Sequence, residues 1–168
     1  MKTIFSFLLF SVLLVLPCQA QDNANTINAA IVNNLNRWHE AAAQADFETY
    51  FGLMTSDAIY IGTDATEHWD LEAFKHFAKP YFDAGKAWDF KAIDRHVFVY
   101  NNNTLAWFDE LLNTHMGICR GSGVMKLENG TWKMAHYVLS MTVPNSKMQD
   151  VVSVKRTDDL NLLKQYKQ

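Results

Sequence analysis

The sequence is poor in the residue that builds disulfide frameworks. Only two cysteines occur among its 168 residues, and one of them, Cys18, lies in an apolar segment at the N-terminus. If that segment is removed, Cys119 is left alone and no intramolecular disulfide can form. The stability of the chain must then come from side-chain packing.

The spacing that metal and phosphate sites require is also missing. The six histidines include no His-x-x-x-His pair and no Cys/His quartet, and no run of carboxylates has the spacing of a calcium loop. Gly117, Gly121 and Gly123 follow a strand pattern and open no helix, so they do not form a phosphate loop. The sequence therefore predicts neither a metal site nor another cofactor.

The sequence also has no cluster of positively charged residues. The chain has 15 basic and 18 acidic residues, a formal net charge of −3, and no basic block or stripe. Phosphate backbones and anionic membrane surfaces both require such clusters. We therefore expect no nucleic-acid partner and no membrane partner, and we expect a small-molecule ligand instead.

The N-terminus contains the one long apolar run. Lys2 precedes residues 4–16, which are almost wholly apolar, and Pro17-Cys18-Gln19-Ala20 follows them. This pattern is typical of a cleavable signal peptide, so we expect a periplasmic or secreted protein. We divide the chain into a signal peptide (1–20), one domain (21–144) and a C-terminal extension (145–168).

Helical periodicity dominates the first half of this domain. Apolar residues recur every three or four positions over 27–45, Asp46 can cap a short helix over 47–54, and an apolar strand follows over 58–62. Asp70 can cap a third helix, which Pro80 would kink or end. The second half reads as four strands, over 88–100, 104–114, 116–127 and 131–143.

This order of elements predicts an α+β fold. We expect a cone-shaped, strongly curved and mostly antiparallel sheet, with the three helices of the N-terminal half covering its concave face. Such a cone can enclose an apolar pocket that contains a few polar groups. The opposite sheet face would be free to pair with a second copy of the chain through Phe108, Tyr137, Leu139 and Met141.

Three stretches carry a family resemblance. They are QADFETYFGLMTSDAIYIGTD, ATEHWD and CRGSGVMKLENGTWKMAHYVLS. Together with the order of elements, they resemble the SnoaL-like branch of the nuclear transport factor 2 superfamily over nearly the whole mature chain. The resemblance implies the cone fold and a pocket. It does not imply one reaction, because the superfamily includes cyclases, ketosteroid isomerase, dehydratases and members that only bind.

Strand alternation suggests which polar side chains enter the pocket. In the last strand His136 and Ser140 share a face with the apolar Trp132 and Met134, so we expect all four to face the helices. On the two preceding strands we place Arg120 and Ser122, then Trp107 and Asp109, on that same face. Buried charges require partners, so a paired cluster of Asp109, Arg120 and His136 is expected. A bulge would present Glu110 in place of Asp109.

The opposite wall of the pocket should come from the first strand and the loop after it. Tyr60 and Trp69 can pack against a ligand and donate one hydrogen bond each, although ordinary core filling is an alternative for both. Asp64 is a ligand candidate or a turn residue. The candidate ligand-binding residues are therefore Tyr60, Asp64, Trp69, Trp107, Arg120, Ser122 and Ser140.

Two functions are compatible with these residues. We expect an exported small-molecule-binding protein whose ligand is apolar or aromatic. The alternative is a proton-transfer enzyme, an isomerase, cyclase or dehydratase, in which Asp109 or His136 acts as the base. An arginine beside Asp109 would hold it ionised and weakly basic, which favours binding over catalysis.

Overall fold

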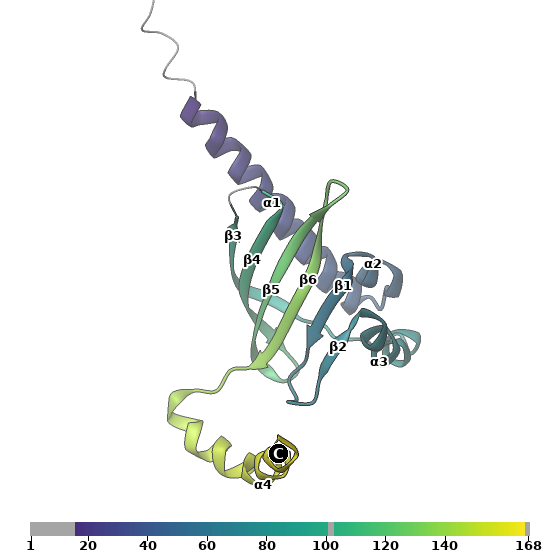
Figure 1. The fold of residues 1–168 in the computed structure, drawn as a ribbon, viewed down its shortest axis with the longest axis vertical. Helices are drawn as coiled ribbons and strands as arrows, with labels where there is room; N and C mark the ends of the chain where they lie inside the picture. Colours follow the sequence, from purple (N-terminus) through teal and green to yellow (C-terminus); the bar gives the residue numbers. More distant parts are fainter. Residues whose placement is uncertain (1–15, 101–102, 167–168) are drawn as a thin grey trace, which may run out of the picture.

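The computed structural model describes residues 16–100 and 103–166 (Figure 1). Most of the predicted signal peptide therefore lies outside the described residues. The helices are α1 (Leu16–Ala43), α2 (Phe47–Gly52), α3 (Leu71–Asp83) and α4 (Met148–Tyr166), with a 3₁₀ turn, η1 (Asn145–Lys147), before the last. The strands are β1 (Met54–Ile61), β2 (His68–Asp70), β3 (Lys91–Val99), β4 (Leu105–Thr114), β5 (Gly117–Glu128) and β6 (Thr131–Met141).

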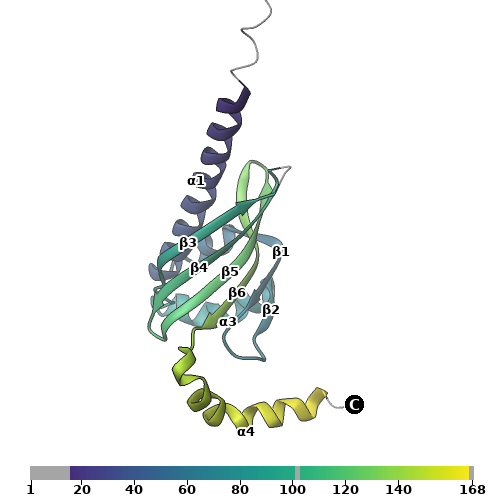
Figure 2. The ribbon, with the colours of Figure 1, turned by 90° about the vertical axis from the view of Figure 1, so that its left-hand side faces the viewer.

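The six strands form one curved sheet in the order β2-β1-β6-β5-β4-β3. Only the β1–β6 pair is parallel, and the other four pairs are antiparallel. Figures 1 and 2 show α1 crossing one face of the sheet, with α2 and α3 on the same side near β1 and β2. The α+β cone with a mostly antiparallel sheet is thus confirmed.

Short polar side chains begin the helices where the sequence predicts. The carboxylate of Asp46 accepts the backbone N–H of Thr49 at 3.0 Å, and that of Asp70 accepts the N–H of Ala73 at 2.9 Å. Each bond satisfies a backbone donor that has no partner inside its helix. Pro80 does not end α3, which continues to Asp83.

A bulge in β6 decides which side chains face the helices. Val124 pairs with His136, but Met125 pairs with Met134, so Ala135 is an extra residue in the strand. Trp132 and Met134 face the core before the bulge, and the facing changes by one residue after it. Tyr137 and Leu139 therefore point inward, while His136 points away from the helices. The predicted inward facing of His136 and Ser140 is wrong.

The extension after β6 forms α4, which stands apart from the sheet in both ribbon views (Figures 1 and 2). None of its side chains is buried, and apolar ones such as Val154 and Tyr166 are largely exposed. No described helix is both long and apolar enough to cross a membrane.

Candidate functional site

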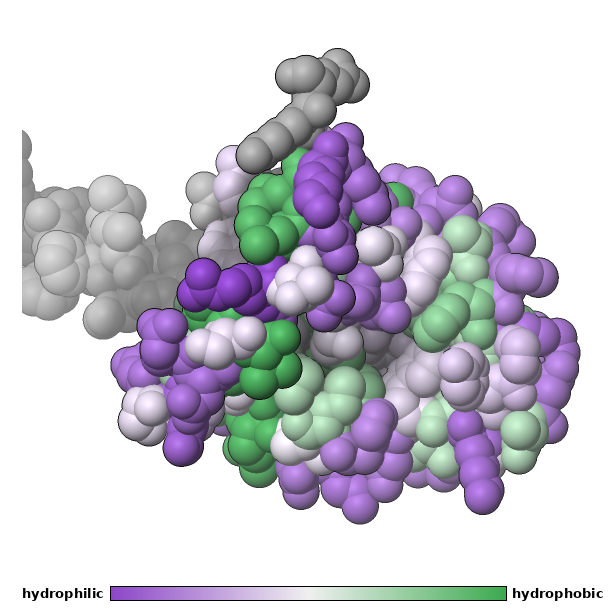
Figure 3. All heavy atoms as spheres, turned by 90° about the horizontal axis from the view of Figure 1, so that it is seen from below, coloured by the Kyte–Doolittle hydropathy of each residue, from purple (hydrophilic) through white to green (hydrophobic). Residues whose placement is uncertain are grey.

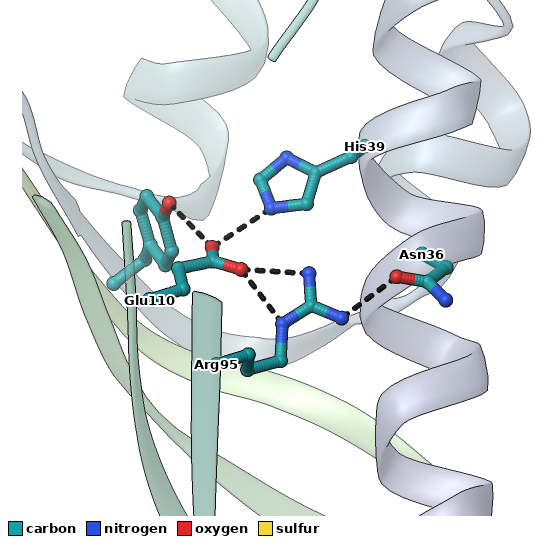
Figure 4. A network of polar contacts seen from close by, with 5 residues as sticks. Asn36, His39, Arg95 and Glu110 are labelled. Atoms are coloured by element: carbon teal, nitrogen blue, oxygen red, sulfur yellow. Dashed lines mark hydrogen bonds and ion pairs between the residues drawn. The ribbon is translucent and has the colours of Figure 1, made fainter. Parts of the chain in front are cut away.

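A buried carboxylate lies at the centre of the cone. Glu110 of β4 is 1% exposed, and its two oxygens accept hydrogen bonds from three elements. Its Oε1 lies 2.8 Å from Nε2 of His39 in α1 and accepts the hydroxyl of Tyr137 in β6 at 2.9 Å. Its Oε2 lies 2.8 Å from Nε and 2.7 Å from Nη2 of Arg95 in β3. Figure 4 shows this network, which continues from Arg95 to Asn36 on α1.

These partners keep Glu110 ionised. Burial by itself would raise the pKa of Glu110, but the hydrogen bond and charge of His39, together with those of Arg95, hold that pKa below its ordinary value. An ionised carboxylate can only accept hydrogen bonds, so Nε2 of His39 must carry a hydrogen. In the neutral imidazole the other nitrogen, Nδ1, is then a proton acceptor.

His39 also lines a cavity of about 500 Å³ between α1 and the start of β3. Glu40, Asp89, Lys91 and Arg95 contribute to its wall, so charged side chains of both signs lie at this cavity. A histidine that a carboxylate orients beside an open space has the geometry of a general base.

A second cavity, of about 430 Å³, is enclosed mainly by aromatic rings. Its volume is in the range typical of small-molecule sites. Residues of β1, β2, α3, the segment before β3 and the β4–β5 turn contribute to it. The aromatic side chains are Tyr60, Trp69, Phe74, Phe77, Tyr81, Trp88 and Phe90.

Several of these rings stack on one another. Tyr60 lies on Phe74 with ring centroids 3.9 Å apart, and Trp69 lies on Phe77 at 4.5 Å. Stacking fixes side chains that would otherwise change rotamer, so the wall is built before any ligand arrives. The β1–β2 and β4–β5 turns lie at the lower end of Figure 1, and Figure 3, which views that end, shows a hollow in the surface.

Two predicted ligand-binding residues lie in this aromatic cavity. Tyr60 is almost fully buried and Trp69 is half-buried, and both contribute to the wall. Asp64 is exposed, and its carboxylate accepts the backbone N–H and the hydroxyl of Thr66 at 2.8 and 2.6 Å. These bonds lower the pKa of Asp64. Asp64 therefore has the geometry of a turn residue.

The other predicted site residues lie on the outer face of the sheet, so their predicted position inside the cone is wrong. Asp109 pairs with His96, at 3.2 Å, and not with Arg120. Arg120 is exposed and forms no ion pair with any residue that the structure describes. The expected cluster of Asp109, Arg120 and His136 is therefore not formed. Trp107, Ser122 and Ser140 share this outer face.

His39 and Arg95 were not among the predicted site residues. Glu110 was considered only as the acid that a bulge would present in place of Asp109. The inner face of β5 could not be recognised from its side chains, because two of its positions are glycines. Tyr137 and Phe108 from the neighbouring strands fill the space at Gly121 and Gly123. The available signal was the face of β4 that carries Ala106, Phe108, Glu110 and Leu112. One acid among three apolar residues of the same face indicates a buried carboxylate.

The chain belongs to the SnoaL-like domain family, which matches residues 31–144. The fold is similar to that of an NTF2-like protein of unknown function from Pseudomonas putida, which is 13% identical, with a TM-score of 0.61 over 73% of this chain and 92% of that one. No curated protein matches the sequence.

Two further solved structures with this fold have names that suggest an activity. A proposed dehydratase of the NTF2-like family from Streptomyces avermitilis is 16% identical, with a TM-score of 0.62 over 72% of this chain and 99% of that one. A proposed ketosteroid isomerase from Parabacteroides distasonis is 20% identical, with a TM-score of 0.55 over 68% and 86%. At these identities the likeness shows the fold alone.

Proposed function

We propose that this chain is an exported small-molecule-binding protein whose ligand, apolar or aromatic in its main body, occupies the aromatic cavity. The observation that supports this most directly is a preformed cavity of about 430 Å³ with seven aromatic side chains in its wall. The apolar N-terminal segment with its preceding lysine supports export.

A fluorescent probe that is neutral and aromatic tests the cavity. N-phenyl-1-naphthylamine should become bright on binding to the protein, and Ala87→Phe, which places a ring in the cavity, should abolish that signal. Ala84→Phe, the same change three residues earlier at an exposed position outside the wall, is the control. The proposal is wrong if the wild type leaves the probe dark, or if Ala87→Phe binds it as well as the wild type does.

A proton-transfer enzyme is the second candidate, and one observation favours it. Nε2 of His39 is fixed by Glu110 at 2.8 Å while the ring lines the 500 Å³ cavity, so Nδ1 is the acceptor when the imidazole is neutral. This replaces Asp109 and His136 as the base, because both face away from the helices. Loss of α-deuterium from labelled cyclic ketones, followed by NMR, should exceed the buffer rate and return to it in His39→Gln. An unchanged rate in the wild type would exclude this activity for those ketones.

We further propose a homodimer through the outer face of the sheet. The residues first assigned to that face are wrong in part, since Phe108, Tyr137 and Leu139 are buried inside the cone. Met141 is exposed as predicted, and Phe98 and Trp107 add two apolar side chains to the outer face, each 46% exposed and stacked with centroids 5.7 Å apart. Two solved structures with this fold are described as proposed association domains of calcium/calmodulin-dependent kinase II, which supports assembly.

Analytical ultracentrifugation measures the oligomeric state directly. A dimer at micromolar concentration that Trp107→Lys converts to a monomer would support the proposal, since a charge at that position cannot be buried against its own copy. A monomeric wild type would refute it.

A further inference from the structure

The wall of the aromatic cavity includes one acidic side chain and no lysine or arginine. Glu67, in the loop between β1 and β2, lines the cavity, and no lysine or arginine shares its wall. Within residues 16–100 and 103–166, no cationic side chain forms an ion pair with Glu67. His115 is the other titratable group of the wall besides the tyrosines, and it is exposed at the β4–β5 turn.

The position of the Glu67 carboxylate is fixed by its own loop. Its Oε2 accepts the backbone N–H of Asp64 at 3.1 Å. The carboxylate also lies over the Cα of Gly62, so a Cβ at that position would overlap it. The backbone N–H of Gly62 in turn donates to the carbonyl of Glu67 at 3.0 Å. The half-buried carboxylate is thus held in a fixed position against its own loop at the cavity wall.

The charge of Glu67 acts on the interior of the cavity. Burial raises the pKa of the Tyr60 hydroxyl, and the charge of Glu67 is the next largest cause of that increase. The charge of Glu67 therefore reaches the Tyr60 hydroxyl in the cavity wall. The faces of aromatic rings are also negative, and Tyr60, Trp69 and Trp88 contribute to the wall.

We propose that the ligand of the aromatic cavity is a small organic cation, a protonated amine or methylated ammonium carried on an apolar body, with Glu67 as its counter-charge. This inference rests on the proposed function, since it names the ligand class of the same site. Aromatic faces and a carboxylate both attract a cation, whereas an anion would meet Glu67 without any lysine or arginine to balance it. A neutral ligand would use the rings and leave the carboxylate without a partner.

A pair of probes of the same shape separates charge from shape. Phenyltrimethylammonium and tert-butylbenzene differ by the replacement of N⁺ with carbon, and benzenesulfonate supplies the anion. Quenching of the fluorescence of the cavity tryptophans, Trp69 and Trp88, measures binding of each probe. The wild type should bind the cation about tenfold more tightly than the neutral probe, equivalent to about 1.4 kcal/mol, and should not bind the sulfonate.

Two variants test the role of Glu67. Glu67→Gln keeps an oxygen that can accept the N–H of Asp64, and should lower affinity for the cation about tenfold while leaving that for the neutral probe within about twofold. Gly62→Ala, which displaces the carboxylate, should reduce the same preference. Glu48→Gln, which removes an exposed carboxylate of α2 that lies outside the cavity, is the control and should change neither affinity.

The outcomes distinguish this inference from the proposed function. If tert-butylbenzene binds as tightly as the cation, or if Glu67→Gln leaves the preference intact, the cation assignment is overturned while ligand binding in the cavity stands. If none of the three probes quenches the tryptophans and N-phenyl-1-naphthylamine also fails to bind, both proposals are refuted together.

Discussion

Arg95→Met tests the buried network of Glu110 most sharply. Arg95 forms a two-pronged ion pair with Glu110, and the side chains are 8% and 0% exposed. Methionine keeps the apolar volume of the arginine stem and removes only its charge and hydrogen bonds. Removing one member of a buried pair leaves an uncompensated charge, which typically costs about 3–5 kcal/mol.

The cost of leaving the Glu110 carboxylate without Arg95 has an upper bound. Glu110 can avoid burying a bare charge by taking a proton, and the ordinary pKa of the group is 4.5. Protonation at pH 7 then costs about 3.4 kcal/mol, since each pH unit is equivalent to about 1.36 kcal/mol. His39 and Tyr137 still donate to the carboxylate. We therefore expect Arg95→Met to cost about 3 kcal/mol at pH 7.

The same reasoning gives the sign of the pH dependence. In the variant the charge and hydrogen bond of Arg95 no longer lower the folded-state pKa of Glu110, so this pKa rises relative to the wild type and the cost of the substitution grows as the pH rises. In the wild type the folded-state pKa is lowered, so its stabilising contribution is retained above pH 4.5 and lost only as the pH falls through the folded-state value. The cost of Arg95→Met should thus decrease by about 2 kcal/mol between pH 7 and pH 5.

Urea midpoints at the two pH values measure this, for Arg95→Met, Glu110→Gln and the double variant. The double variant should lose less than the sum of the singles by at least about 1 kcal/mol. Lys126→Met is the control, because the Lys126–Asp57 pair has the same 2.7 Å separation but is 39% and 64% exposed, and should cost less than about 1 kcal/mol. Additive losses, or a cost of Arg95→Met that does not change with pH, would refute the network as described.

Three further predictions follow from local geometry. Tyr137→Phe removes a hydroxyl that donates to the buried carboxylate and should cost about 1.5–3 kcal/mol. Tyr50→Phe removes a buried hydroxyl whose one polar neighbour is the indole of Trp88, without good hydrogen-bond geometry, and should cost less than Tyr137→Phe; urea midpoints in the opposite order would contradict this. Gly121→Ala places a methyl group against Tyr137 and should cost about 1–3 kcal/mol, while Gly52→Ala meets nothing within 4 Å and should not destabilise; equal melting temperatures would count against the packing. The thiol of Cys119 is fully buried, so a thiol reagent should label it only on unfolding, and rapid labelling of the native protein would contradict that burial.

Local patterns were sufficient for the elements and for part of the site. Helix caps at Asp46 and Asp70 depend on the chemistry of neighbouring residues, so the starts of α2 and α3 could be predicted from the sequence. The first helix was predicted to begin at residue 27, whereas α1 begins at Leu16. The strands could be predicted in the same way, because β-branched and aromatic residues alternate along them. Tyr60 and Trp69 were candidates because their rings can pack against a ligand and donate a hydrogen bond, and both line the aromatic cavity.

The inner face of β4 to β6 could not be read from alternation alone. Both faces of these strands carry large apolar side chains: Phe108 and Leu112 lie on one face of β4, and Trp107 and Leu111 on the other. The bulge at Ala135 then reverses the facing within β6, and a shift of one residue exchanges the two faces. Glu110 is buried and Asp109 is not, because the face of β4 that carries Phe108 and Leu112 is the one that packs against the helices.

The sequence by itself determined most of the elements and their order, because these depend on propensities and caps that act within a few residues. The family was indicated by the resemblance of its motifs. The tertiary structure decided which acid is buried and what surrounds it. His39, Arg95, Glu110 and Tyr137 come from four elements separated by up to 98 positions, and only sheet register and the crossing of α1 bring them together. Pairwise contacts of that kind leave no periodic signal along the chain, since each is formed by packing between elements whose separation in sequence is arbitrary.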